Sequence, residues 1–237
     1  MSPTAGDPAE VGAVEAPEVR PEHPFTEIEV VGVAAVERAV APTLRFAAEI
    51  SDASGREVYT IALTALIEIE PSKRRYDDAG RERLVELFGP PERWSSTTQT
   101  LRWAQVEALV PGFHDRTRFE IDVPCTYDLE VASAKYFDAL EDGEAPLRFH
   151  FTGSVFYCGE NGRLQLVRVP WDATARVGLP AETWRAMIDS HYPDGGWVTL
   201  HRETLRRLSR MRASSGLPTL DACVAELLDG AERQEES

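Results

Sequence analysis

Apolar and polar residues alternate along much of the first 170 positions. The clearest runs are Leu44–Ile50, Ile61–Ile69, Phe119–Val123 and Leu147–Val155, where every second residue is apolar, apart from Gly153. A period of two is typical of a strand that buries one face. Weaker runs near 28–30, 100–110 and 164–169 predict further strands. Because the first three strands follow one another through short links, the pattern favours antiparallel pairing.

Helical spacing replaces alternation in other parts of the chain. Asp77 or Asp78 can cap a short helix that ends before Gly89, and residues 131–141 fit a short helix better than a strand. Helical character dominates after about residue 173. Three helices are predicted there: one entered at Pro180, one over 201–213 and one capped by Thr219.

Strands come first and helices last, so the predicted fold class is α+β, a mostly antiparallel β-sandwich or curled sheet followed by a helical C-terminal segment. The composition divides the chain further. Residues 1–24 are rich in Pro, Ala and Glu and predict a disordered acidic tail. We expect a β-rich domain over 25–172, a helical segment packed on it over 173–229, and a second acidic tail over 230–237.

Charge limits the classes of partner. The formal net charge is −15, and residues 1–25 and 226–237 each have a net charge of −4, from five acidic residues and one arginine. An acidic surface repels phosphate backbones, so we expect no nucleic-acid partner. The sequence shows no apolar run of membrane-spanning length and no basic, apolar leader, so we expect no membrane partner. Cys125, Cys158 and Cys223 lie far apart, which favours a reducing, cytoplasmic location.

Linear motifs for chemistry are absent from the sequence. It contains no glycine-rich phosphate loop, no nucleophile elbow and no paired-histidine zinc motif. We therefore predict no catalytic, cofactor-binding or metal-binding residues and no cofactor. Two sites that the fold could assemble stay open: a metal site from His114, His150 and Cys158, and a carboxylate pair at Glu68 and Glu70 on the polar face of one strand.

Two features suggest a protein partner. One is a basic face on the predicted 201–213 helix, since arginine at helical spacing can pair with carboxylates. The other is tryptophan beside loops, which often marks a binding surface. The alternatives are an ordinary solvated helix face and tryptophans that fill the seam between sheet and helix. The candidate partner-binding residues are Arg202, Arg206, Arg207, Arg210, Trp171 and Trp197.

Several short segments together resemble an uncharacterised family of actinobacterial proteins over about residues 25–228. They are Pro42–Phe46, Ile67–Pro71, Leu87–Gly89, Val123–Asp128, Ala134–Tyr136, Phe151–Tyr157 and Val169–Trp171. No activity comes with this resemblance, so it assigns no catalytic residue. It places such proteins near nickel–iron hydrogenase genes, and it implies an accessory or assembly role rather than a redox role.

The leading hypothesis is therefore a non-enzymatic accessory or protein-interaction protein, linked to hydrogenase assembly or operation, with an unidentified protein partner. The alternative is a small-molecule binding protein or enzyme with a pocket between the sheet and the C-terminal helices. Such a pocket would be lined by Trp171, Trp184 and Trp197, with His150 or Glu130 as its polar group.

Overall fold

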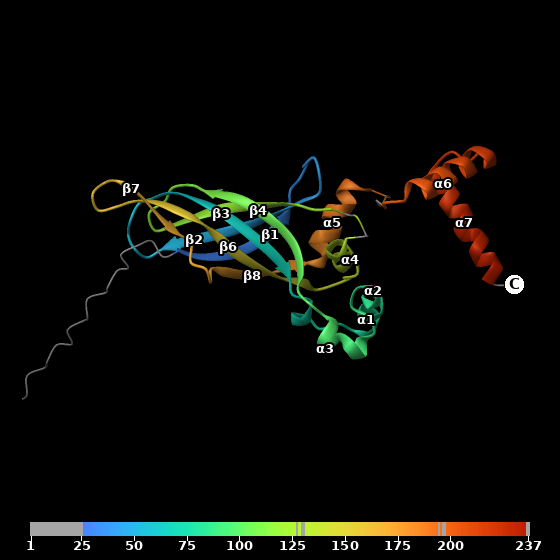
Figure 1. The fold of residues 1–237 in the computed structure, drawn as a ribbon, viewed down its shortest axis with the longest axis horizontal. Helices are drawn as coiled ribbons and strands as arrows, with labels where there is room; N and C mark the ends of the chain where they lie inside the picture. The colour runs from blue at the N-terminus through green and yellow to red at the C-terminus, as the bar shows by residue number, and fades with distance from the viewer. Residues whose placement is uncertain (1–25, 127, 129–130, 194, 196–197, 236–237) are drawn as a thin grey trace, which may run out of the picture.

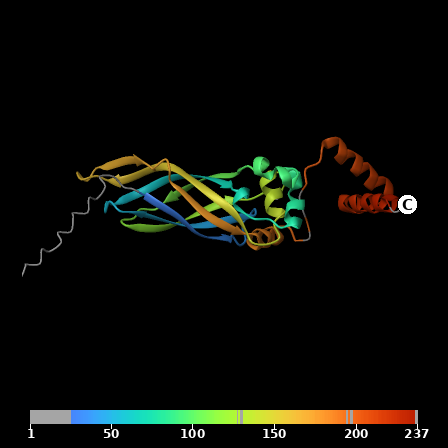
Figure 2. The ribbon, with the colours of Figure 1, turned by 90° about the horizontal axis from the view of Figure 1, so that it is seen from below.

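The computed structural model describes residues 26–126, 128, 131–193, 195 and 198–235. Two antiparallel sheets face each other in it (Figures 1 and 2). The strands are β1 (Thr26–Ala35), β2 (Thr43–Asp52), β3 (Val58–Ile69), β4 (Leu101–Val110), β5 (Arg116–Pro124), β6 (Glu144–Cys158), β7 (Leu164–Arg168) and β8 (Thr174–Pro180).

One sheet has the order β1-β2-β5, and the other has the order β4-β3-β6-β7, with β8 also paired to β6. The chain crosses between the sheets from β2 to β3, from β4 to β5 and from β5 to β6. The sheets meet at both sides, because β1 lies beside β8 and β4 lies beside β5. This arrangement resembles an immunoglobulin-like sandwich.

Alternation along the strands builds the core between the sheets. Inward residues of β2 and β3, such as Phe46 and Ile67, are fully buried, and so are Phe149 and Phe151 on β6. Their polar neighbours face outward, as expected for sheets that bury one face each. Phe46 and Phe149 meet across the sandwich with ring centroids 5.1 Å apart.

A small helical lobe lies between β3 and β4. It contains α1 (Asp78–Arg83), α2 (Val85–Phe88), α3 (Trp94–Thr97) and two short 3₁₀ turns, Pro71–Lys73 and Pro91–Arg93. The Asp77 side chain accepts a hydrogen bond from the Gly80 backbone N–H at 2.8 Å, which caps α1 as the sequence predicts. The expected single helix is divided at Leu84, which ends α1 and begins α2.

Aromatic side chains join the sandwich to the helices beside it. Trp103 of β4 packs edge-on against Phe137 of α4 (Ala132–Asp138), and Phe137 stacks on Trp184 of α5 (Ala181–His191), with centroids 5.0 and 4.5 Å apart. The buried Tyr136 hydroxyl lies 2.7 Å from that of Tyr76, between α4 and the helical lobe. Burial raises the pKa of both hydroxyls, so both stay protonated.

The last two helices, α6 (Arg202–Ser215) and α7 (Leu220–Glu235), pack on each other and stand away from the sandwich in both views (Figures 1 and 2). We call this pair the C-terminal hairpin. Gly216 adopts a left-handed conformation, with φ of 67°, and ends α6. Within the described residues, no helix combines the length and the apolar character needed to cross a membrane.

The predicted fold class is confirmed. Two local predictions are wrong. Strand β8 lies in the stretch predicted to be helical, where Ala175, Val177 and Leu179 alternate with polar or small residues and pair with β6. Helix α7 continues to Glu235, through part of the predicted 230–237 tail, because residues 231–235 are mostly good helix formers. The other domain limits stay predictions, and the 1–24 tail lies outside the described residues.

Two tryptophans in opposite environments provide a test of this core. Trp184 is 2% exposed and Trp171 is 92% exposed. We expect Trp184→Ala to lower the free energy of unfolding by about 3–5 kcal/mol, because it leaves a cavity beside Phe137. Trp171→Ala should change it by less than about 0.5 kcal/mol. Urea unfolding followed by far-UV circular dichroism measures both, and equal losses would contradict the assigned core.

Candidate interaction surface

The edge formed by β7 and β8 is interrupted at residues 169–173. Both strands pair with β6, and backbone hydrogen bonds hold each side of the interruption. The Val169 N–H donates to the Gly153 carbonyl at 3.1 Å, and the Phe151 N–H donates to the Ala173 carbonyl at 2.9 Å. The interruption is therefore a fixed feature of the sheet edge.

Trp171 and Asp172 form the corner of a tight turn within this interruption. The Ala173 N–H donates to the Pro170 carbonyl at 3.1 Å, which closes a four-residue turn. Trp171 is 92% exposed, the largest exposed fraction of any aromatic side chain that the structure describes. A large aromatic ring on an anchored turn is a typical interface anchor.

An open groove of about 530 Å³ lies beside this turn, between β1 and β8. Its walls are Glu27–Val30 on one side and Pro170 with Asp172–Arg176 on the other. Within the described residues, β1 pairs only with β2 and β8 only with β6, so the groove is bordered by two strand edges. Such edges carry unpaired backbone donors and acceptors.

The charges that line the groove are mostly negative. Glu27, Glu29 and Asp172 supply three carboxylates, and Arg176 supplies the one cation of the lining. The Arg176 guanidinium is already engaged, since its Nε donates to the Glu70 carboxylate at 3.1 Å. The groove therefore favours a positively charged occupant.

Arg176 belongs to a row of charges on the outer face of the larger sheet. Glu70 also pairs with Arg148 at 3.3 Å, and Arg148 pairs with Glu68 at 3.1 Å. His150 lies 2.9 Å from the same Glu68 oxygen. β3, β6 and β8 bring these five residues together because Glu68 is opposite Arg148, and Arg148 is opposite Arg176.

The candidate carboxylate pair, Glu68 and Glu70, is thus bound by cations. Partial burial opposes ionisation of Glu68, but hydrogen bonds from Arg148 and His150 outweigh it and hold the pKa of this carboxyl below its usual range. A general acid needs the opposite shift, because it must hold its proton near neutral pH. The arrangement here stabilises the sheet face and orients Arg176.

A second open depression of about 710 Å³ lies at the end of this row, near Glu70, Lys73, Arg74, Glu144 and Gly178. Arg74 donates hydrogen bonds to the backbone carbonyls of Asp142 and Glu144, at 2.8 and 3.0 Å.

Across the described residues, no group of three or more His, Cys, Asp or Glu side chains has the arrangement of a metal site.

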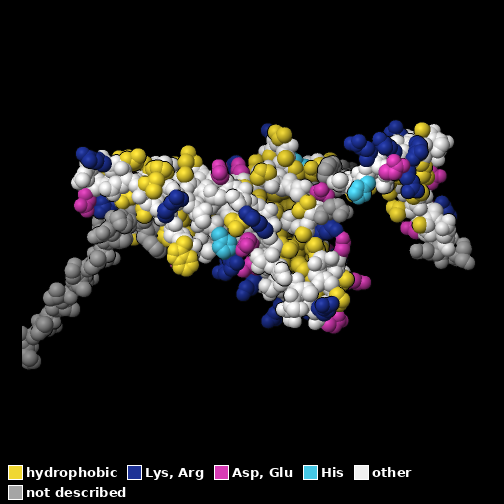
Figure 3. Space-filling view, viewed as in Figure 1, with side chains coloured by type: hydrophobic (Ala, Val, Ile, Leu, Met, Phe, Trp, Pro, Cys, Tyr) yellow, Lys and Arg dark blue, Asp and Glu magenta, His cyan; other side chains and the backbone are white. Residues whose placement is uncertain are grey.

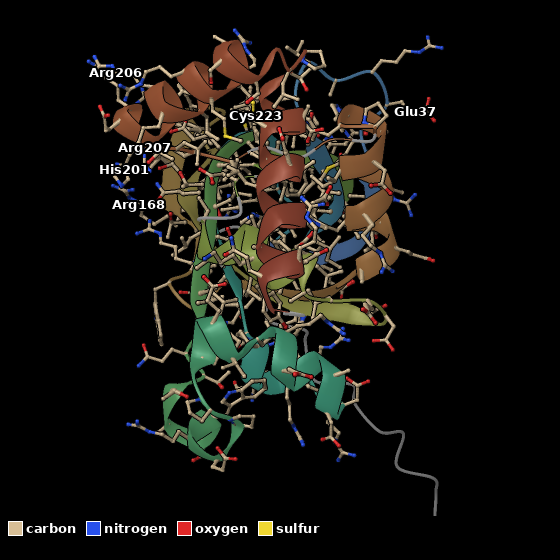
Figure 4. The ribbon with its side chains drawn as sticks, turned by 90° about the vertical axis from the view of Figure 1, so that its right-hand side faces the viewer. Glu37, Arg168, His201, Arg206, Arg207 and Cys223 are labelled. Atoms are coloured by element: carbon tan, nitrogen blue, oxygen red, sulfur yellow. The ribbon has the colours of Figure 1, made fainter. Side chains whose placement is uncertain are left out.

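The structure separates the two predicted partner-binding features. Arg202, Arg206, Arg207 and Arg210 are exposed on α6, and Arg206 and Arg207 point outward from the C-terminal hairpin (Figure 4). Arg206 and Arg210 pair with Glu203 at 3.7 and 3.3 Å. Trp171 lies on the sandwich edge, and Trp197 lies outside the described residues.

Of the residues expected to line a pocket between sheet and helices, the three that the structure describes, Trp171, Trp184 and His150, do not converge. Trp184 is buried and stacks on Phe137, so it is part of the core. His150 faces outward on β6, where it meets Glu68. Glu130 lies outside the described residues.

Sequence reasoning missed the acidic groove. Glu27 and Glu29 alternate with buried Ile28 and Val30, a pattern that marks a strand but not its neighbour. Asp172 lies across the groove from β1 only because β8 pairs with β6. The one usable signal was the sequence from Pro170 to Asp172, a turn-forming stretch with an aromatic residue at its centre.

Comparison with family profiles gives a match over residues 23–236 to a family of unknown function, DUF6084. The chain belongs to the DUF6084 family. This membership covers the sandwich, the Trp171 turn and the C-terminal hairpin, and it assigns no activity to any of them. No curated protein matches the chain.

Similarity to solved structures is low. A Bordetella pertussis protein named as ApaA is 10% identical, with 68% of this DUF6084 chain and 96% of that chain covered and a TM-score of 0.28. A late embryogenesis abundant (LEA) protein is 11% identical, with 67% and 74% covered and a TM-score of 0.32. A β-glucosidase from Kluyveromyces marxianus is 6% identical, with 67% and 15% covered and a TM-score of 0.26. These values support no inference about function.

Acid sensitivity tests the charged row. A carboxyl whose pKa is lower in the folded protein stabilises it above the pKa of the unfolded chain, and this stability is lost as the pH falls through the folded pKa. As the pH drops from about 6 to about 3, we expect the urea midpoint of the wild type to fall more than that of Glu68→Gln.

The control is Glu92→Gln, at an exposed carboxylate with no ion pair among the described residues. It should lose as much stability as the wild type over the same pH range. Identical losses in the wild type and in Glu68→Gln would show that the Glu68 contacts do not stabilise the fold.

Proposed function

We propose that this protein is a non-enzymatic interaction protein that binds a protein partner through the Trp171 turn and the acidic groove beside it. The exposure of Trp171 on a turn anchored to β6 carries this proposal. Burying a tryptophan ring contributes more to an interface than most side chains do. A side chain this exposed is unfavourable in isolation, and a partner would remove it from water.

The rigidity of the turn supports the same function. Hydrogen bonds at Val169, at Ala173 and across the turn fix the backbone on both sides of Trp171. A preorganised anchor loses little conformational entropy when a partner binds. Flexible exposed loops bear a larger entropic cost for the same contact area.

The groove indicates the kind of segment that binds. Its borders are strand edges, which recognise an extended chain through backbone hydrogen bonds. Its carboxylates, Glu27, Glu29 and Asp172, favour lysine or arginine on that chain. We therefore propose an extended basic segment of a partner protein as the ligand.

The family resemblance supplies the first partners to test. It associates such proteins with nickel–iron hydrogenase genes, so the proposal includes an accessory role in the cytoplasm beside hydrogenase subunits or their assembly factors. An interaction surface without a catalytic arrangement is compatible with that role.

Loss of the Trp171 ring should remove the anchor. In affinity purification from the native host, we expect Trp171→Ala to lower recovery of a stoichiometric partner by at least about tenfold. Leu109→Ala is the matched control, because Leu109 is also an exposed apolar side chain, 73% exposed on β4. Recovery of the wild type only as free protein, or equal recovery by Trp171→Ala, would overturn the proposal.

Reversal of the groove charge tests the basic segment. Glu27→Lys with Glu29→Lys should slow association with the captured partner, because charges at an interface rim act mainly on the association rate. The wild-type rate should fall with added salt, and the double variant should lose this dependence. Surface plasmon resonance at two salt concentrations measures both. An unchanged rate would show that the groove does not meet a basic segment.

A further inference from the structure

The C-terminal hairpin buries very little of its own surface. Across the described parts of α6 and α7, only Leu208 and Cys223 are buried. They meet between the two helices, where the Cys223 Sγ lies 4.0 Å from the Leu208 carbonyl oxygen. Isolated helices of 14 and 16 residues are marginal in water, and a unit this small does not bury enough apolar surface to stabilise itself. The hairpin therefore needs further contacts.

An apolar stripe lies on one side of the hairpin. Leu205 on α6 is 41% exposed, and Val224, Leu227 and Leu228 on α7 are 40, 49 and 59% exposed. Val224 and Leu228 are four residues apart and so share one face of α7. Antiparallel packing about Leu208 and Cys223 places Leu205 beside Leu227, so the stripe spans both helices.

Charged residues lie at both ends of this stripe, and they are basic on α6 and acidic on α7. On α6, Arg202 lies three residues before Leu205 and Arg212 lies seven residues after it, so both share the side of the helix that carries Leu205. On α7, Asp221 and Glu232 flank Val224 and Leu228 in the same way. The two arginines are about 15 Å apart along the helix axis and the two carboxylates about 16.5 Å, at about 1.5 Å per residue.

The complementary charges do not neutralise one another within the hairpin. On α6, Glu203 pairs with Arg206 and Arg210 of the same helix. Arg202 and Arg212 have no such partner in the described structure, and neither have Asp221 and Glu232. Figure 3 shows the basic side chains gathered over α6. The helix ranges Arg202–Ser215 and Leu220–Glu235 have net charges of +4 and −4.

We propose that two copies of this chain associate through their C-terminal hairpins to form a four-helix bundle. In this bundle, α6 of each copy packs against α7 of the other, and the apolar stripes form the centre. Arg202 and Arg212 of one copy then lie opposite Asp221 and Glu232 of the other. A two-fold axis produces this contact twice, so both sets of charges are paired. The bundle covers the exposed leucines as core positions.

A second copy fits these features better than other occupants. A two-fold partner offers an equal apolar stripe, charges of opposite sign and the same spacing along the helix axis. The hairpin stands away from the sandwich of its own chain (Figures 1 and 2). The Trp171 groove takes no part in the bundle, so this inference stands or fails independently of the proposed partner binding.

Mass measurement of the full-length chain provides the first test. Sedimentation equilibrium should give twice the monomer mass of 26.3 kDa. Leu205→Glu with Leu228→Glu should weaken self-association by at least about 100-fold, because it places carboxylates in the bundle core. The control Leu109→Glu, at a leucine that is 73% exposed on the sandwich, should remain dimeric.

Charge exchange tests the pairing of α6 with α7. One variant carries Arg202→Glu and Arg212→Glu, and a second carries Asp221→Arg and Glu232→Arg. Each alone should be monomeric, because like charges then face each other across the bundle. An equimolar mixture should form a heterodimer. The acidic α6 of the first variant then meets the basic α7 of the second, and the unchanged α7 of the first meets the unchanged α6 of the second.

Three results would overturn the inference. The wild type could stay monomeric at every concentration, with small-angle scattering showing the hairpin folded onto its own sandwich. It could dimerise equally well with both leucines replaced, which would place the interface elsewhere. The two charge variants could also fail to associate when mixed, although circular dichroism shows that both keep their helices.

Discussion

The contact between Phe137 and Trp184 connects the parts of this structure. The stacked rings join α4 to α5, and Trp103 extends the contact into β4. Since α5 directly follows β8, this packing also fixes where the last strand of the sandwich ends. β8 itself is held by its pairing with β6 and by the buried side chain of Leu179.

The core of the sandwich is held by apolar packing, whereas the outer face of its larger sheet carries paired charges. Charges on β3, β6 and β8 pair in register, so Glu68, Glu70, Arg148 and Arg176 neutralise one another at the surface. The groove beside β1 has an excess of carboxylates instead. Charges are therefore balanced on the face where β3, β6 and β8 pair, and they are unbalanced in the groove where the edges of β1 and β8 meet.

The C-terminal hairpin separates its charges further. Basic residues gather on α6 and acidic residues on α7, with an apolar stripe between them. An even mixture of charges would have allowed many ion pairs within each helix. Separation by helix leaves both signs available to another surface. The two contact surfaces that we propose for the DUF6084 chain therefore lie apart, one on the sandwich edge and one on the hairpin.

The sequence by itself determined the class of the fold. Alternation over Leu44–Ile50 and Ile61–Ile69 predicted buried strands, and the i, i+3 and i+4 spacing over 201–213 predicted an amphipathic helix, because these periods depend only on local backbone geometry. It also identified Trp171 and the α6 arginines as candidate contacts. Only the tertiary structure decided their surroundings: Trp171 is exposed while Trp184 is buried, although both follow proline-containing turns or helix starts. The acidic groove joins Glu27 to Asp172 across about 145 positions of sequence, and such a contact follows from strand order, which no local pattern encodes.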